Sequence, residues 1–119
     1  MSRTSATVLA LGDYRAKHRT VYFTRSELNQ LLGLYSRHVA RGVWRDYAID
    51  HRDGIALFSV FRHTHEAPAY CIVKSAPASA RLPEFIVQTG RQRLRVAANL
   101  ADALEFFRVR LSLVGAQTG

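Results

Sequence analysis

Seven residues, from Ile55 to Phe61, constrain the fold of this chain more than any other stretch. They read IALFSVF, and β-branched, aromatic and large aliphatic residues of this kind favour a β-strand. Successive side chains of a strand point to opposite faces. One face would carry Ile55, Leu57 and Phe61, and the other Ala56, Phe58 and Val60. Because both faces are apolar, we predict a central strand covered on both sides, by helices on one and by a curl of the sheet or a partner subunit on the other.

Two further strands are expected beside it. The Asp53-Gly54 pair is a hairpin signal, because glycine takes the positive φ that such turns require. Before the turn, Arg45 to His51 nearly alternates polar and apolar residues, which predicts a half-buried strand. After the central strand and a longer loop, Tyr70 to Lys74 reads as a third strand.

The segment that precedes this meander predicts a strand followed by a helix. Arg19 to Phe23 reads as a first strand. Thr24 and Glu27 have the spacing of a capping box, so a helix should begin there. Gly42 supplies its C-terminal stop. The apolar face of this helix is formed by Leu28, Leu31, Leu32, Tyr35 and Val39.

The second half predicts a hairpin and a second helix. Ser75 to Pro83 is a loop by composition, and Phe85 to Thr89 and Gln92 to Val96 form a hairpin about Gly90. Asn99 can cap the last helix. That helix carries two apolar stripes, Leu100, Ala103, Leu104, Phe107 and Leu111 on one side and Phe106, Val109 and Leu113 on the other.

The element order predicts an α+β domain. Its mainly antiparallel sheet would have about five to six strands, with two helices packed on one face. We expect residues 1–18 to be a flexible arm, residues 19–113 a single domain and residues 114–119 a tail.

Charge and cysteine content bear on partners and location. The formal net charge of +8 invites a nucleic-acid interpretation, but the excess is spread along the chain without a basic block. The sequence shows neither an export signal nor an apolar run of membrane-spanning length, and the one cysteine cannot form an internal disulfide. These features predict a cytoplasmic protein with no membrane partner.

The sequence also resembles a known family. The similarity runs from about Val21 to Leu111, and its most specific parts are WRDYAIDH and FSVFR, with PAYCIVK after them. These segments are similar to the bacterial domain-of-unknown-function family 2794. The resemblance implies a bacterial protein of this size, and it carries no catalytic or binding residue across to this chain.

The densest group of reactive side chains lies on the first strand of the meander. Arg45, Asp46, Tyr47, Asp50 and His51 could bind an anionic ligand or perform acid–base chemistry. Alternation places Asp46 and Asp50 on the face of Trp44, and the other three on the opposite face. A strand with a Trp anchor and cross-strand ion pairs is the competing interpretation.

Three residues elsewhere have metal-binding or nucleophilic chemistry. His63 and His65 would project together on an extended chain, but a transition-metal site needs a further ligand that the sequence does not identify. Cys71 lies in an apolar strand, which favours a small buried hydrophobe over a nucleophile. We therefore assign no metal, no cofactor and no catalytic residue.

The strand from Gln92 to Val96 carries the one basic concentration worth testing. Leu94 and Val96 would face inward, leaving Arg93 and Arg95 outward beside Arg91. Arginines at alternate outward positions could follow a phosphate backbone. A solvated sheet face is the competing interpretation.

Three functional hypotheses follow. The first is a small non-catalytic interaction or regulatory module that forms a homodimer, because the apolar surplus exceeds what two helices cover. The alternative is RNA or DNA binding through Arg91, Arg93 and Arg95. The third is an enzyme with a site near Asp46 and Asp50.

Overall fold

A five-stranded antiparallel sheet forms one layer of the structure. The computed structural model describes residues 20–77, 79 and 81–108; the predicted arm (1–18) and tail (114–119) lie outside these ranges. The strands are β1 (Asp46–Arg52), β2 (Ile55–Phe61), β3 (Tyr70–Ser75), β4 (Glu84–Thr89) and β5 (Gln92–Ala97). They pair in chain order, β1-β2-β3-β4-β5. The predicted α+β class is confirmed, with five strands in the described part of the chain.

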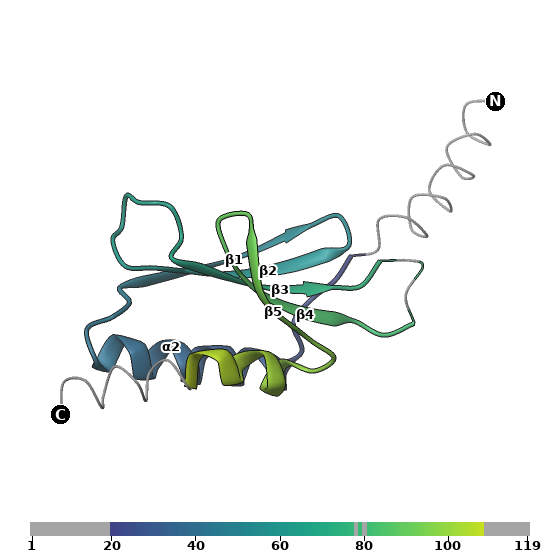
Figure 1. Cartoon of the computed structure of the whole chain (residues 1–119), viewed down its shortest axis with the longest axis horizontal. Coiled ribbons are helices and arrows are strands. Elements are labelled where there is room, and N and C mark those ends of the chain that lie inside the picture. The colour runs from purple at the N-terminus through teal and green to yellow at the C-terminus, as the bar shows by residue number, and fades with distance from the viewer. Residues whose placement is uncertain (1–19, 78, 80, 109–119) are drawn as a thin grey trace.

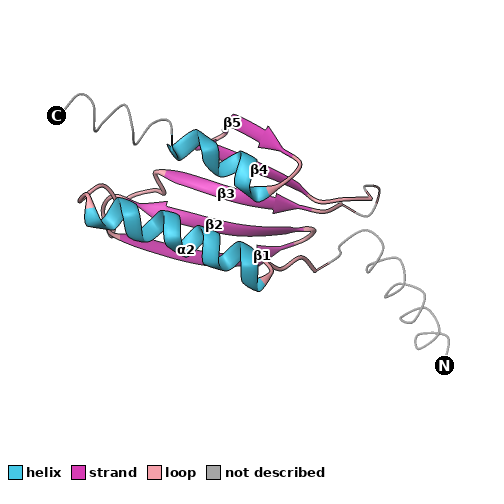
Figure 2. Ribbon diagram, turned by 90° about the horizontal axis from the view of Figure 1, so that it is seen from below, coloured by secondary structure: helices cyan, strands magenta, loops and turns pink. Residues whose placement is uncertain are grey.

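Two helices form the second layer, both on one face of the sheet (Figure 1). They are α2 (Arg25–Ala40) and a C-terminal helix at residues 100–108. Figure 2 shows α2 across β1 and β2, and residues 100–108 over the β3–β5 half. Between the layers lies a core of fully buried side chains, the largest being Trp44, Phe58, Phe107, Leu31, Ile72, Val60 and Val87.

The ends of α2 follow the predicted signals. The Thr24 hydroxyl accepts the Glu27 backbone N–H, and the Glu27 carboxylate accepts the Thr24 N–H. At the other end Gly42 has φ +72°, and the N–H of Val43 donates to the carbonyl of His38. This is a Schellman motif, which satisfies carbonyls that the last turn would leave unpaired.

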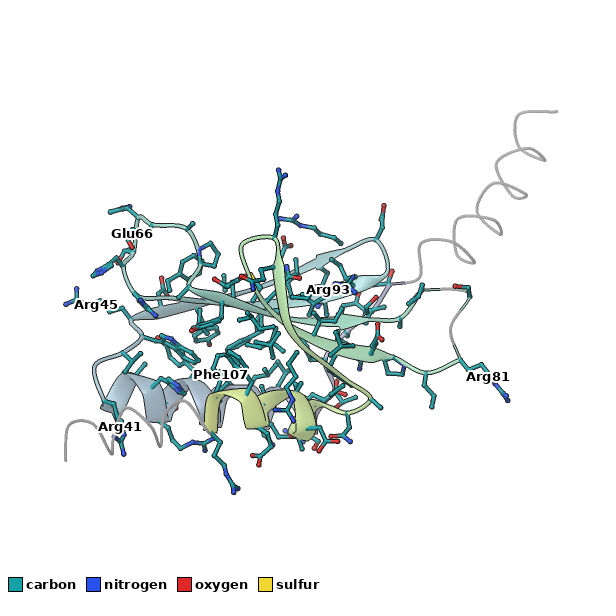
Figure 3. The ribbon with its side chains drawn as sticks, in the orientation of Figure 1. Arg41, Arg45, Glu66, Arg81, Arg93 and Phe107 are labelled. Carbon is teal, nitrogen blue, oxygen red and sulfur yellow. The ribbon has the colours of Figure 1, made fainter. Side chains whose placement is uncertain are left out.

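The C-terminal helix begins at the predicted cap. The Asn99 side-chain oxygen accepts the Asp102 N–H at 2.8 Å, and its amide group donates to the Asp102 carboxylate at 3.0 Å. Leu100, Ala103 and Phe107 are buried in the core, and Figure 3 labels Phe107 between the helices and the sheet. The predicted stripe residues Leu111, Val109 and Leu113 lie outside the described residues.

The central position of β2 is confirmed, but the described helices cover only one of its faces. Ala56, Phe58 and Val60 are completely buried under the helices. Ile55, Leu57 and Phe61 are only half-buried, and no described helix lies over them (Figure 1). We call this second surface the open face.

The strand predicted at residues 45–51 is confirmed as β1, but the prediction that it is half-buried was wrong. All seven residues of β1 are exposed, and β1 is an edge strand with a neighbouring strand on one side only. Tyr47 and Ile49 face the helices yet stay 39% and 41% exposed. Alternation of residue type predicts which way a side chain points, and not how well it is covered.

The predicted first strand at Arg19–Phe23 was also wrong, since residues 20–24 have no regular secondary structure. The alternation itself was informative: Val21 and Phe23 are buried, while Tyr22 is 62% exposed. The Tyr22 carbonyl is bound by the side chain of Lys74, at 2.9 Å. The Lys74 side chain therefore supplies the hydrogen bond that a neighbouring strand would give to this carbonyl in a sheet.

Candidate interaction surface

The five candidate ligand-binding residues near β1 do not converge on one site. The Tyr47 ring stacks on Phe58 at 5.3 Å, and the His51 ring lies 4.7 Å from Tyr22, so both belong to the helix side. Asp46 and Asp50 pair with Phe61 and Leu57 and therefore lie on the open face. Trp44 does not share their side, because it is buried in the core. Arg45 precedes β1 and donates its backbone N–H to Phe61 at 2.8 Å.

The carboxylates of Asp46 and Asp50 accept hydrogen bonds from the backbone of β1 itself. Asp46 accepts the N–H of Tyr47, and Asp50 accepts the N–H of His51, each at 2.8 Å. The hydrogen bond from His51, followed by that from Arg52, lowers the pKa of Asp50. An amide that already donates to a carboxylate is not free to pair with another strand. Asp46 and Asp50 therefore protect the edge of the sheet from strand addition.

The arginines of β5 are not arranged as the sequence predicted. The register shifts between Val87 and Gln88, so that Arg95 is opposite Val87 while Arg93 is opposite Gln88. Since Val87 and Gln88 point to opposite faces, the two arginines fall on different sides of the sheet. Val96, expected to face inward, is opposite Ile86 on the open face and is 46% exposed. Arg91 lies in the turn.

The candidate metal ligands and the cysteine lie in different parts of the fold. His63 and His65 lie in the exposed β2–β3 loop, and the described residues contain no group of three metal-ligating side chains. Cys71 is not the buried hydrophobe that we expected. It is half-buried on the open face, where its Sγ lies 3.3 Å from the Ser59 hydroxyl.

The strand registers arrange the open face in rows that run across the sheet. One, the apolar row, joins Leu57 of β2 to Val73 of β3, Ile86 of β4 and Val96 of β5. The next, the polar row, joins Ser59, Cys71 and Gln88 and ends in Arg93. Val73 and Ile86 are buried in the single chain, at 6% and 3% exposed, so the exposed apolar surface of this row comes from Leu57 and Val96.

A second feature is a groove of about 630 Å³ between α2 and the C-terminal helix. Arg37, Arg41 and Arg108 line it, and Arg108 pairs with Glu105 at 3.4 Å. Arg37 and Arg41 lie near the C-terminal end of α2, where cations stabilise the helix dipole. The positive charge that Arg37 and Arg41 give the groove is therefore explained by their stabilising effect on α2.

His38, which also lines this groove, belongs to the core. Its ring stacks on Trp44 at 3.8 Å, and its Nδ1 lies 2.9 Å from the Leu34 carbonyl. That bond fits the neutral tautomer with the proton on Nδ1. Burial is the main cause that lowers the pKa of His38, with Arg37 and Arg41 adding to the effect.

We expect stability to fall as the pH drops below about 6.5, the pKa of an unperturbed histidine. In that range the unfolded chain binds a proton at residue 38 that the folded chain does not, so acid favours unfolding. Urea unfolding at pH 7.5 and pH 5.5 measures the difference. The variant His38→Phe, which keeps an aromatic ring against Trp44, should show a smaller loss; an equal loss would contradict this origin.

The sequence indicated a second apolar face on β2, but not how that face continues across the other strands. Leu57, Val73, Ile86 and Val96 are each visible as strand residues, but only the registers show that they form one row. The register shift in β5, which brings Val96 and Arg93 to this face, has no signal in the sequence. The apolar excess of β2 was the one indication that a second surface needed a cover.

Comparison with known proteins gives a family and no function. The model of the family described as Protein of unknown function (DUF2794) matches residues 21–103, which is more than half of the chain. No curated protein and no solved structure shows a significant match. No helix in the described part of the chain is both long and apolar enough to cross a membrane. Because the family model covers residues 21–103, the protein is a member of the DUF2794 family.

Proposed function

We propose that this protein is a small non-catalytic interaction module that acts as a homodimer through the open face of its sheet. The supporting observation is the apolar row, which lies on the side that no described helix covers and whose Leu57 and Val96 keep exposed surface. Apolar rows of this kind are normally buried against a second layer, as in β-sandwiches. In this proposal a second copy of the chain supplies that layer, in the cytoplasm.

Both edge strands are unsuited to adding a strand from a second copy, which supports association through the open face. At β1, Asp46 and Asp50 occupy backbone N–H groups that an added strand would need. At β5, the register shift and the exposed Arg93 and Arg95 interrupt a regular edge. Such features discourage edge-to-edge association.

The test is the mass of the protein in solution. Sedimentation equilibrium at 50 µM should give twice the chain mass of 13.4 kDa. Leu57→Glu should give a monomer, because a carboxylate placed in the apolar row would be buried without a partner. Val96→Glu, at the exposed end of the same row, gives a second variant that perturbs the folded chain less.

The matched control is Val39→Glu. Val39 is an apolar residue of α2 that is 41% exposed, on the opposite side of the molecule from the open face. This variant should remain dimeric. A monomeric wild-type protein, or an equal loss of dimer in Val39→Glu and Val96→Glu, would refute the proposal; circular dichroism checks that each variant folds.

Nucleic-acid binding is the weaker alternative. It required Arg91, Arg93 and Arg95 to share one outward face, and the register shift separates Arg93 from Arg95. Binding of mixed RNA or DNA at low salt that drops on replacing all three with Glu would favour it over the dimer.

A further inference from the structure

We propose that the two copies are related by a two-fold axis that runs along β3, so that β1 of each copy lies over β5 of the other. This inference rests on the proposed homodimer and specifies its geometry. Two sheets packed face to face by a two-fold axis leave two simple choices, since the axis must lie in the plane between them. It runs either along the strands or across them.

An axis along β3 brings residues of like polarity together on the three central strands. A rotation about β3 keeps each residue level along the strands, so the apolar row of one copy meets the apolar row of the other. Leu57 then faces the partner's Ile86, and Val73 faces its own counterpart. At the margin, Val96 faces the partner's Asp50. In the polar row, Ser59 faces the partner's Gln88, where a hydroxyl and an amide can hydrogen-bond.

An axis across the strands mixes the rows unless it passes through one of them. With its centre between the two rows, it places Ser59, Cys71 and Gln88 against the partner's apolar row. Gln88 would then lose water without gaining a hydrogen-bond partner, which opposes association. An axis across the strands that passes through the apolar row avoids this mismatch, but it places Asp50 over the partner's Asp50, and two like charges in contact oppose association. The axis along β3 avoids both costs.

The charges at the two margins agree with this choice. On the open face Asp46 and Asp50 lie at the β1 margin on either side of Ala48, and Arg93 lies at the β5 margin, level with Ala48 through the registers. The axis along β3 places Arg93 of each copy over the partner's Ala48, between the two carboxylates. An axis across the strands would place β1 over β1 and leave Arg93 over β5.

The shape of the face is compatible with close packing. Figure 1 shows the sheet twisted, with the β4–β5 turn rising on the open side and the loop of residues 62–69 rising beyond one end of the strands. Two copies of a twisted sheet nest when a two-fold axis relates them, because both have the same hand. Contact is therefore expected over the rows between the strand ends.

Crosslinking between the two margins tests the axis. Two chains are prepared in a Cys71→Ser background, one with Ala48→Cys and one with Arg93→Cys; both positions are exposed. With sheets about 10 Å apart, a cysteine at 48 lies about 10 Å from one at 93 in the partner, backbone to backbone. Two copies of Ala48→Cys would instead be separated by four strand spacings, about 19 Å sideways.

The reagent is a bismaleimide whose span lies between these two distances. We expect a covalent dimer from the co-expressed pair and little from either variant alone. A covalent dimer from Ala48→Cys alone, or a sedimenting dimer that no combination crosslinks, would overturn the axis and leave the homodimer standing. A wild-type monomer would instead overturn the proposed function itself, so the two failures are distinguishable.

Discussion

Replacing Phe58 with alanine should lower the free energy of unfolding by about 4 kcal/mol, the usual cost of removing a buried aromatic ring. Phe58 is completely buried at the centre of β2. Its ring stacks on Tyr47, and its cross-strand neighbours are Ile49 and Ile72. Three strands and the helical layer meet at this side chain, so the cavity left by its removal cannot collapse easily. Urea unfolding followed by circular dichroism measures the change.

The matched control is Phe61→Ala, the same substitution on the same strand. Phe61 points to the open face and is only half-buried, so its removal should cost roughly 1 to 2 kcal/mol. The comparison is made at the lowest usable protein concentration, so that self-association does not add to the result. Equal costs at that concentration would mean that both faces are covered within the single chain.

This contrast shows what the sequence can predict about a strand. The alternation of Ile55 to Phe61 predicts correctly which side chains share a face. It does not distinguish a face covered by helices from one left for a partner, because both are apolar. That distinction depends on where two helices of limited width pack, which no local pattern records.

The helices illustrate the same limit. The cap at Thr24 and Glu27 and the stop at Gly42 were predicted to the residue, because capping is a local interaction. The buried face of α2 is Leu31, Leu34 and His38, and Val39 lies outside it. His38 was not expected in the core, since its burial depends on Trp44, six residues away beyond the turn.

The candidate site was the hardest part to predict. Asp46 and Asp50 have residue types common in catalytic sites, but their hydrogen bonds show a structural role at an edge. Arg93 and Arg95 looked like one surface until the register shift separated them. A bulge of one residue changes the face of every side chain beyond it, so a site inferred from alternation depends on a register that the sequence does not record.

The second large effect is expected at Lys74, a charged residue in the core layer. Its Nζ lies 2.8 Å from Glu27 and 2.9 Å from the Tyr22 carbonyl, and 5.9 Å from the centre of the Phe85 ring. The side chains of Lys74 and Glu27 are only 10% and 16% exposed. The same Glu27 oxygen also accepts the N–H of Thr24. One ion pair therefore joins β3, the start of α2 and the segment before it.

Lys74→Met should lower the free energy of unfolding by about 3 kcal/mol, because it leaves the Glu27 carboxylate nearly buried without its cation. Adding Glu27→Gln should recover part of that loss, since no buried charge then remains. Arg108→Met, which breaks the exposed pair with Glu105, is the control and should cost less than about 1 kcal/mol. If Lys74→Met costs no more than Arg108→Met, the ion pair does not hold α2 against the sheet, and the buried side chains alone set the position of that helix.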